Sequence, residues 1–374
     1  MNVVEKIHRI EGQMNANYIE RKGEIRAILL GVLAQKNVLF IGNPGVAKSS
    51  VIDQFMRSFE GDIQTFTRLI SPTTQPEELF GSAKFERLKD GIIERNVENL
   101  LPVAHFAFLD EIFKSTSDLL NGLLKIMNEH TFENGGKQIK SPLFTLIGAS
   151  NEFPEEDNLS ALYDRFLIRR EVEAIKTPEK LIEMLIGNTS KVEVEKLSLK
   201  EISEAQKLVL DVEIPLHIIT KMAEIHFKLK DSGIVVSDRR TKHCLVILKA
   251  SAFLNRRHEV IATDFHAIED CLWNEADERS TVRDILIEYT KTEVQQILEK
   301  TSKLYNRIEA RKYMREQRND SVNYVEQANF GSDLLLELME LNTRFDELNK
   351  TQDEQKGMSE IIAKIHKLLA EEVL

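Results

Sequence analysis

Short apolar runs alternate with helical patterns through the first 174 residues of the chain. The runs Val38 to Ile41, Phe106 to Leu109 and Leu143 to Gly148 are rich in β-branched and aromatic residues and have the length of strands. They lack alternating polar positions, which is typical of strands that are buried on both faces of a parallel sheet. Residues 1–174 are therefore predicted to form an α/β domain, with helices flanking a parallel sheet.

Strand signals fade after residue 174, and apolar positions at helical spacing replace them. Lys242 to Phe253 is an example, and residues 175–276 are predicted to form a small all-α domain. Residues 277–374 are rich in charged residues and predict a further helical region, either a helical hairpin or a pair of amphipathic helices. The apolar positions of that region are Tyr289, Val294, Ile297 and Leu304, followed by Leu334 to Leu341 and Ile361 to Leu369.

Length and composition limit the class of protein. A chain of 374 residues is expected to form two or three domains, and its formal net charge of −11 argues against the broad basic face that sequence-independent nucleic-acid binding needs. No apolar run reaches the roughly 18 residues of a membrane span, and the N-terminus carries charges where a signal peptide needs an apolar core. Cys244 and Cys271 are spaced unlike a metal or redox motif, so we expect buried thiols and a cytoplasmic protein.

The run GNPGVAKSS, residues 42–50, directly follows the first predicted strand and precedes a helical pattern. Glycines let the main chain curl around a phosphate, and backbone N–H groups at the start of a helix face anions. We expect Lys48 to reach the β- and γ-phosphates of ATP and the Ser49 hydroxyl to coordinate Mg²⁺. The residues expected to bind the nucleotide are Gly42, Asn43, Pro44, Gly45, Val46, Ala47, Lys48, Ser49 and Ser50.

Residue 47 departs from the usual pattern of such a phosphate-binding loop, because the pattern has glycine before the lysine and this chain has Ala47. A methyl group there requires a negative φ angle or spare room. The loop is therefore expected to be slightly altered, while its N–H donors and Lys48 are retained. The alternative interpretation is a Gly/Pro turn that happens to precede Lys48 and Ser49.

Two further predicted strands end in polar residues that suit the hydrolysis of a nucleoside triphosphate. After Phe106 to Leu109, Asp110 is expected to hold Mg²⁺ through water, and Glu111 to orient or deprotonate the water that attacks the γ-phosphate. Two acids after a strand also occur as a helix N-cap. Asn151 follows the third strand and is expected to lie between the first two, within reach of the γ-phosphate and the attacking water, although asparagine is also a routine turn residue there.

Four motifs together resemble those of a known class of proteins. GNPGVAKS, FLDE, GASN and LYDRF resemble, in their order and spacing, the motifs of the AAA+ ATPases. Within that class the chain resembles the MoxR branch, in particular the regulatory ATPase variant A (RavA) subgroup, and this branch also tolerates alanine before the P-loop lysine. The resemblance covers residues 15 to 275. The segments that carry the closer likeness are Glu20-Arg21, Thr67-Arg68, Pro76 to Gly81, Ala149 to Glu152 and Ala161 to Arg165.

The resemblance implies roles for two arginines. Arg165 is similar to an arginine finger, which acts on the γ-phosphate held by a neighbouring subunit. Val236 to Arg240 is similar to the sensor-2 segment of the helical lid, with Arg239 as the expected phosphate contact and Arg240 as its close rival. The alternative for either arginine is a surface salt bridge. With these residues, the resemblance implies ATP and Mg²⁺ as cofactors.

Two insertions and a partner class also come from the resemblance. The insertions are Phe85 to Glu94, with a turn at Lys89-Asp90-Gly91, and Thr131 to Gly136. We expect them to form hairpins that line or face the pore of a ring, which is expected to be a hexamer, although an ordinary surface hairpin predicts the same turns equally well. Proteins with a von Willebrand factor A (vWA) domain are the implied partners. RavA-type proteins carry a long, partly β-structured module after the lid, whereas residues 277–374 predict helices, so the identity of the partner is not carried over.

We therefore expect a MoxR-type ATPase that hydrolyses ATP in a ring and couples hydrolysis to chaperone-like remodelling or maturation of a partner protein. Two other classes of function stay open at the level of sequence. One is a P-loop motor that is stimulated by nucleic acid, which the acidic composition disfavours. The other is a scaffold that binds ATP and assembles with little turnover, which the full set of expected catalytic residues disfavours.

Overall fold

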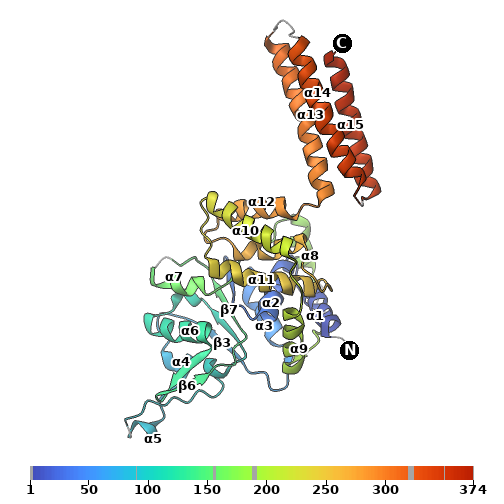
Figure 1. Ribbon diagram of the computed structural model, residues 1–374. Helices are drawn as coiled ribbons and strands as arrows, with labels where there is room; N and C mark the ends of the chain where they lie inside the picture. Colours follow the sequence, from blue (N-terminus) through green and yellow to red (C-terminus); the bar gives the residue numbers. More distant parts are fainter. Residues whose placement is uncertain are drawn as a thin grey trace. The chain divides into compact units, whose positions relative to one another are not determined.

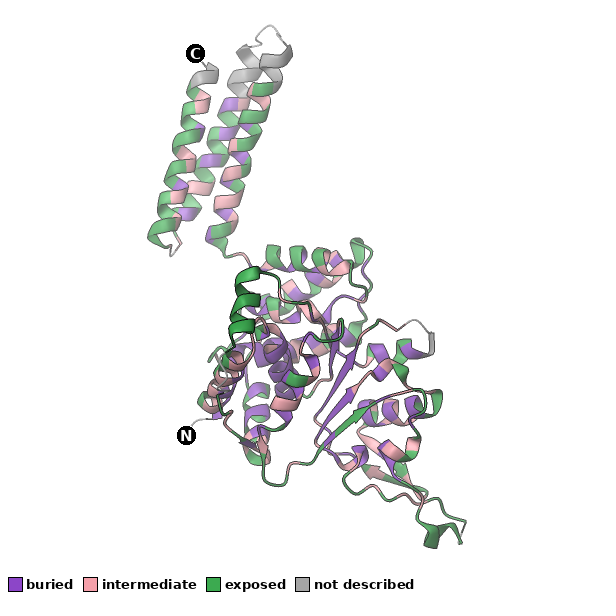
Figure 2. Ribbon diagram, turned by 180° about the vertical axis from the view of Figure 1, so that it is seen from behind, coloured by how far each residue is buried: buried purple, intermediate pink, exposed green. Residues whose placement is uncertain are grey.

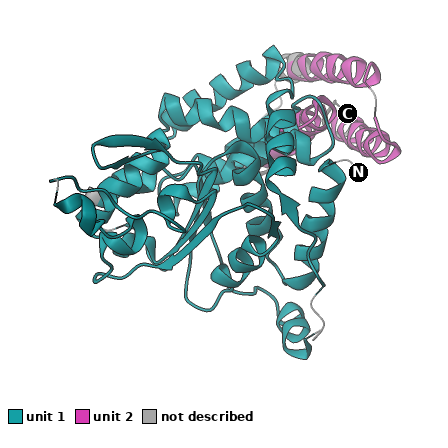
Figure 3. Ribbon diagram, turned by 90° about the horizontal axis from the view of Figure 1, so that it is seen from below, with its two compact units in different colours: residues 1–289 teal, residues 290–374 magenta. Residues whose placement is uncertain are grey.

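The computed structural model describes residues 3–89, 91–154, 157–187, 192–318, 324–348 and 350–373. The chain forms two compact units, residues 1–289 and residues 290–374, which Figure 3 distinguishes by colour. Within the first unit, the expected α/β and all-α domains share one hydrophobic core, which runs from Val3 to Leu286. The expected domain boundaries at residues 174 and 276 stay predictions.

A five-stranded parallel sheet lies at the centre of the first unit, in the order β3-β4-β7-β1-β8. The three predicted strands are present, and the α/β fold class with a helical second part is confirmed. Two strands at the edges of the sheet, β3 and β8, were not predicted. The strands are β1 (Val38–Ile41), β3 (Thr65–Leu69), β4 (Phe106–Asp110), β7 (Thr145–Ser150) and β8 (Ile168–Glu171).

Alternate residues of the inner strands pack into two different hydrophobic cores, because successive side chains of a strand point to opposite faces. In β1, Val38 and Phe40 join the core that includes α2 and α3, whereas Leu39 and Ile41 join the core that includes α4, α6 and α7. Figure 2 shows that the strands are buried, and Figure 1 shows helices on both sides of the sheet. The helices are α1 (Val3–Asn17), α2 (Lys22–Ala34), α3 (Lys48–Met56), α4 (Pro76–Phe80), α6 (Ser117–Glu129) and α7 (Asp157–Asp164), with short 3₁₀ turns η1 (Leu101–Val103) and η2 (Ile112–Lys114).

In the described part of residues 175–289, the regular elements are helices apart from one two-residue strand, which agrees with the expected all-α second part. Their core includes the two free thiols, Cys244 and Cys271, which are buried as expected. None of the helices in the described ranges is both long and apolar enough to cross a membrane. The elements are α8 (Pro178–Ile186), β9 (Leu197–Ser198, paired with β2, Phe59–Glu60), α9 (Leu199–Leu210), α10 (Leu216–Asp231), α11 (Asp238–Leu254), the 3₁₀ segment η3 (Ala262–Cys271) and α12 (Glu278–Thr290).

The two expected insertions lie against each other. The second is a hairpin of β5 (Thr131–Asn134) and β6 (Lys137–Lys140), whose turn at Gly135-Gly136 has positive φ angles at both residues. The first contains the short helix α5 (Phe85–Leu88) and is closed by an antiparallel bridge between Ala83 and Arg95. Asn134 joins the two, since its side chain bonds both the N–H and the C=O of Arg95. Of the expected turn Lys89-Asp90-Gly91, Asp90 lies outside the described residues.

The second unit contains three helices, so the prediction of a helical hairpin or a pair of helices is wrong in number. The helices are α13 (Glu293–Arg318), α14 (Tyr324–Asp346) and α15 (Gln352–Val373). Each contributes a few apolar residues to two small cores, among them Leu304, Leu338 and Ile365. The number of helices did not follow from the sequence pattern, because many charged residues separate these apolar positions.

Candidate active site

The run from Gly42 to Ser50, which is expected to bind phosphate, forms the corner between β1 and the start of α3. Gly42 is required there by space, since a Cβ atom would lie 2.3 Å from the carbonyl oxygen of Val172. Gly45 has φ +84°, and Ala47, the residue before α3, has φ +67°. Ala47 therefore has the left-handed conformation, which costs a non-glycine residue roughly 1–2 kcal/mol. A methyl group was expected to need either a negative φ angle or spare room, and the structure excludes the negative φ angle.

Lys48 is the first residue of α3, and its side chain is buried. Its ammonium group donates to the carbonyl oxygens of Gly42 and Asn43 and, at 2.9 Å, to Oδ1 of Asn151. Burial lowers the pKa of Lys48, while Asp110 and Glu111 oppose this shift. The lysine is thus held over the loop by oxygen atoms, as expected for a group that binds phosphate oxygens there.

The predicted metal ligands lie next to each other. Asp110 is the last residue of β4, and its Oδ2 atom accepts a hydrogen bond of 2.9 Å from the Ser49 hydroxyl of α3. Mg²⁺ commonly takes one or two protein oxygens and completes its octahedron with water and substrate phosphates. The described residues contain no cluster of three or more His, Cys, Asp or Glu side chains that suits a metal. The Ser49 and Asp110 pair therefore fits an ion that arrives with a nucleotide.

Asn151 lies between Lys48 and Glu111, because β7 pairs with β4 on one side and β1 on the other. Its Nδ2 atom donates to Oε1 of Glu111, and its Oδ1 atom accepts from Lys48. Glu111 has φ +54° and occupies the N-cap position of the 3₁₀ turn that follows, but its side chain makes no capping bond there. The Lys114 ammonium lies 3.4 Å from its Oε2 atom.

Two residues near the loop have placements that the sequence did not indicate. Arg21 is buried, and its guanidinium donates to the carbonyl oxygens of Val46 at 3.0 Å and Glu173 at 2.9 Å. It thereby ties the loop to the segment after β8. Only the motif Glu20-Arg21 pointed to this residue. Ser50, expected to bind nucleotide, is exposed, and both its carbonyl and its hydroxyl oxygen contact the hydroxyl of Tyr18.

Arg165 and Arg239 lie at the edge of the sheet where the strands begin, which we call the amino edge. The loop lies at the carboxyl edge, where the strands end. Val38 pairs with Ile168 in parallel register, so residue 37 and residues 165–167 precede their strands at the same edge. The strand from Asn37 to Gly42 spans roughly 16 Å at about 3.3 Å per residue. Arg165 and Arg239 both line a cavity of about 160 Å³ at this edge. The structure therefore brings these two arginines together and separates them from Lys48.

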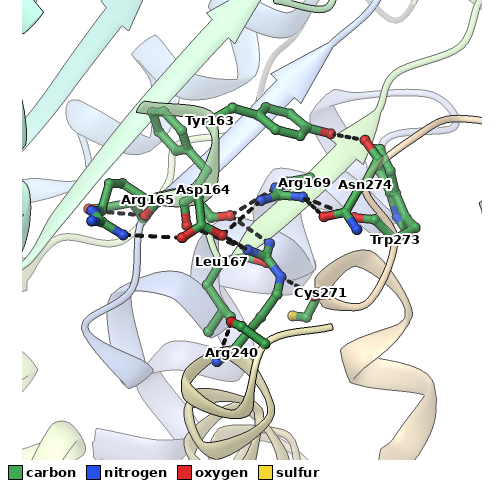
Figure 4. A network of polar contacts seen from close by, with 12 residues as sticks. Tyr163, Asp164, Arg165, Leu167, Arg169, Arg240, Cys271, Trp273 and Asn274 are labelled. Atoms are coloured by element: carbon green, nitrogen blue, oxygen red, sulfur yellow. Dashed lines mark hydrogen bonds and ion pairs between the residues drawn. The ribbon is translucent and has the colours of Figure 1, made fainter. Parts of the chain in front are cut away.

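Arg240, the alternative to Arg239 as the expected phosphate contact, is buried and has many hydrogen-bond partners (Figure 4). Its guanidinium donates to the carbonyl oxygens of Cys271, Phe166 and Leu167 at 2.6, 2.8 and 2.9 Å, and lies 3.3 Å from Oδ1 of Asp164. It thus connects α11 to the end of α7 and the start of β8. Arg239 is exposed, and the described residues offer its side chain no hydrogen-bond or ion-pair partner.

Asp164 is shared by three arginines. Its Oδ2 atom lies 3.1 Å from Arg165, and its Oδ1 atom lies 3.3 Å from Arg240 and 3.6 Å from Arg169. Arg169 is buried in β8 and also donates to the carbonyl oxygen of Trp273. Burial and the nearby Arg240 lower the pKa of Arg169. No sequence pattern indicated this network (Figure 4), because a buried arginine in a strand has no local signature.

The chain is similar in sequence to known families over most of its length. Residues 5–210 match the family described as the MoxR domain in the MoxR-vWA-beta-propeller ternary systems, and residues 217–286 match the family described as an AAA lid domain. Two uncharacterized proteins of Methanocaldococcus jannaschii are each 36% identical to it, one over 83% of this chain and 82% of its own length, the other over 73% and 72%. The chaperone MoxR1 of Mycobacterium tuberculosis is 29% identical over 39% of this chain and 38% of that protein.

A solved structure shares the fold. The structure of a candidate ATPase from Cytophaga hutchinsonii has a TM-score of 0.61 and 19% sequence identity, and the match covers 77% of this chain and 94% of that one. The family match alone spans more than half of the 374 residues, and it contains the loop, both acids, Asn151 and Arg165. The chain therefore belongs to the MoxR family of AAA+ ATPases.

Proposed function

We propose that this protein hydrolyses ATP and that the loop from Gly42 to Ser49 holds the triphosphate. The observation that carries the proposal is the chain of contacts Lys48–Asn151–Glu111 beside the Ser49–Asp110 pair. These five side chains lie together at the C-terminal ends of the strands, which supports Lys48 as a phosphate-binding cation, Glu111 as a base and Ser49 with Asp110 as a metal-binding pair. These are the groups that phosphoryl transfer to water requires.

Each side chain has a separate task in this mechanism. Lys48 binds β- and γ-phosphate oxygens, and Ser49 with Asp110 holds Mg²⁺, which neutralises phosphate charge when bound. Glu111 orients the attacking water and accepts its proton. Asn151 bonds both Lys48 and Glu111, so it fixes the distance between the phosphate-binding cation and the base.

Arg165 and Arg239 are proposed to act on the nucleotide of a neighbouring copy. They lie at the edge of the sheet opposite Lys48, so neither reaches its own chain's phosphates without a large rearrangement. A ring, which we propose to be a hexamer, joins the carboxyl edge of one copy to the amino edge of the next. An arginine supplied in this way is worth about 10³ to 10⁵ in turnover.

The partner is proposed from the family. The matched family is described by ternary systems of MoxR, vWA and β-propeller proteins, and the relative from Mycobacterium tuberculosis is named a chaperone. We accordingly expect a vWA-domain partner and chaperone-like remodelling or maturation of a bound protein. The position within the RavA-like subgroup stays a prediction from the motifs.

The proposal is tested by substituting Arg165 with alanine in the assembled protein. Turnover should fall about 10³-fold or more while ATP binding is retained, because the substituted side chain serves the neighbouring site. Arg283→Ala, which removes an exposed arginine paired with Glu269, is the matched control. Unchanged turnover in Arg165→Ala would reject a site completed by a second copy. Lys48→Ala should instead lose nucleotide affinity, and retained affinity would reject the loop as the phosphate site.

A further inference from the structure

The cavity that holds Arg165 and Arg239 also contains a third cation, Lys36. The cavity lies between the end of α2, the end of α6, the end of α7 and the start of α11. Four cationic side chains line it, and Asp164 is the one carboxylate among its lining residues. The cations are Lys36, Arg165, Arg239 and Arg240.

These four cations differ in how they are neutralised. Arg240 is saturated by its carbonyl acceptors, and Arg165 is paired with Asp164. The ammonium of Lys36 and the guanidinium of Arg239 have no acceptor within the described part of the chain. In addition, Nε of Arg165, which lines the cavity, is buried without a hydrogen-bond partner. An orphaned buried donor beside two unpaired cations is unfavourable unless an anion binds there.

The electrostatics of the cavity agree with this imbalance. Burial and then the positive charge of Arg239 lower the pKa of Lys36. Burial lowers the pKa of His243 to about 4, and Lys36, Arg239, Arg240 and Lys242 add to the effect. His130, also on the cavity wall, has a lowered pKa because of burial, with contributions from Lys36 and Lys140. Like charges gathered in a partly buried site are typical of functional anion sites.

The backbone around Lys36 is fixed. Gln35 closes α2 with φ +51°, and the N–H of Lys36 donates to the carbonyl oxygen of Gly31 at 2.8 Å. The next residue, Asn37, donates from its side chain to the carbonyl oxygen of Arg165 at 3.2 Å and accepts from the N–H of Leu146 at 3.0 Å. Lys36 and Arg165 are therefore attached to one rigid corner, which suits two cations that contact the same ligand.

We propose that Lys36, together with Arg165 and Arg239, binds the terminal phosphate of the nucleotide held by a neighbouring copy of this chain. The inference rests on the proposed function, in that the phosphate belongs to a second copy's Lys48 site. Lys36 supplies a compact positive charge, whereas an arginine presents a planar fork of donors. Its contribution is charge stabilisation of the phosphoryl group during hydrolysis, so it adds a catalytic residue that no motif in the sequence marks.

The test compares Lys36→Met, Lys36→Arg and Lys242→Met in assembled protein. Lys242 is exposed on α11 and does not line the cavity, so its substitution is the matched control for loss of one positive charge. Lys36→Met should lower kcat about 10²-fold with KM for ATP unchanged, the loss typical of one transition-state donor. Lys36→Arg should recover most of that loss, and Lys242→Met should retain the original rate. Removal of a crowded charge should not lower Tm, so the loss of kcat is not a loss of folding.

A mixing experiment shows whether Lys36 acts across copies. Lys36→Met subunits keep their own nucleotide site, and Lys48→Ala subunits keep Lys36 but lack that site. Mixed rings should regain turnover that neither variant has alone. If Arg165→Ala abolishes turnover while Lys36→Met matches Lys242→Met, the inference about Lys36 is wrong and the proposed function stands. A Lys36→Met defect that mixing leaves unrestored also overturns it. Unchanged turnover in Arg165→Ala instead rejects the part of the proposed function in which a second copy completes the site.

Discussion

Replacement of Arg240 should destabilise residues 1–289, whereas the same replacement of its neighbour Arg239 should not. The two residues follow each other at the start of α11, but only the Arg240 side chain is buried. Its three shortest hydrogen bonds, of 2.6 to 2.9 Å, end on the carbonyl oxygens of Cys271, Phe166 and Leu167. Arg240→Met removes these donors, although the carbonyl oxygen of Phe166 keeps a bond of 3.1 Å from Nε of Arg169.

The magnitude follows from those bonds. A hydrogen bond to a charged group contributes about 1.5–3 kcal/mol, and three of them give an upper bound of roughly 5–9 kcal/mol. The effects of neighbouring bonds are not additive, and breaking a buried charged network by removing one partner costs about 3–5 kcal/mol. Arg240 also lowers the pKa of Arg169, so its removal relieves some repulsion. We therefore expect about 3 kcal/mol for Arg240→Met and less than about 0.5 kcal/mol for Arg239→Met.

Trp273 gives a direct assay. It is the one tryptophan of the chain, it is fully buried, and its carbonyl oxygen accepts a hydrogen bond from Arg169 in the same network. Its fluorescence during urea denaturation therefore reports the unfolding of residues 1–289. Arg240→Met should shift the midpoint to lower urea at an unchanged slope, and Arg239→Met should overlay the original curve.

ATP turnover should distinguish the two arginines in another way, because Arg239→Met should lose activity without losing stability. Arg239→Met should lose hydrolysis at full stability, because its guanidinium lines the cavity that we propose to bind the phosphate of a neighbouring copy. The reasoning fails if both variants lose stability equally, or if Arg240→Met unfolds at the original urea concentration. It also fails if Arg239→Met keeps the original turnover in assembled protein.

Three other changes test the site. Glu111→Gln should bind ATP with unchanged affinity and hydrolyse it at least about 10²-fold more slowly, and normal turnover would remove Glu111 from the role of base. Ala47→Gly should raise the free energy of unfolding by up to about 1 kcal/mol, because glycine adopts φ +67° without strain. The urea midpoint should rise accordingly, and a lower midpoint would contradict the strain argument. The pKa of His243 is lowered to about 4 in the fold, so its protonation favours the unfolded chain. The stability should therefore be fully present above pH 6.5 and fall as the pH drops toward 4. His243→Gln should reduce the slope of Tm against pH in that range, and an unchanged slope would contradict it.

The residues at the carboxyl edge of the sheet were predictable from the sequence, because each one directly follows a buried strand along the chain. Asp110, Glu111 and Asn151 each follow a buried run directly, and parallel strands end at the same edge. Their roles remain predictions, but their proximity to Lys48 follows from strand order alone. The edge strands were missed for a similar local reason. β3 is mostly exposed, and β8 reads Ile-Arg-Arg-Glu, which is unlike a buried run.

The amino edge was not predictable to the same degree. Which of Arg239 and Arg240 is buried depends on the rotation of α11 against the segment from Asp164 to Leu167, which is a tertiary fact. Lys36 stands in no motif, and its proximity to Arg239 arises because α2 and α11 pack together. The signals that pointed to this edge were the family motif around Arg165 and the segment from Val236 to Arg240, which resembles sensor 2.

The two edges are joined by β1, and this has a consequence for how a ring would work. β1 is buried along its whole length and pairs with β7 on one side and β8 on the other. Lys36 and Asn37 precede it, and Gly42 follows it. A strand that is paired on both sides cannot slip without breaking hydrogen bonds to both neighbours, so β1 is a rigid connection between the two ends of the sheet. Under the proposed function, β1 would therefore link the phosphate site of each copy to the cations that we propose to act on the next copy.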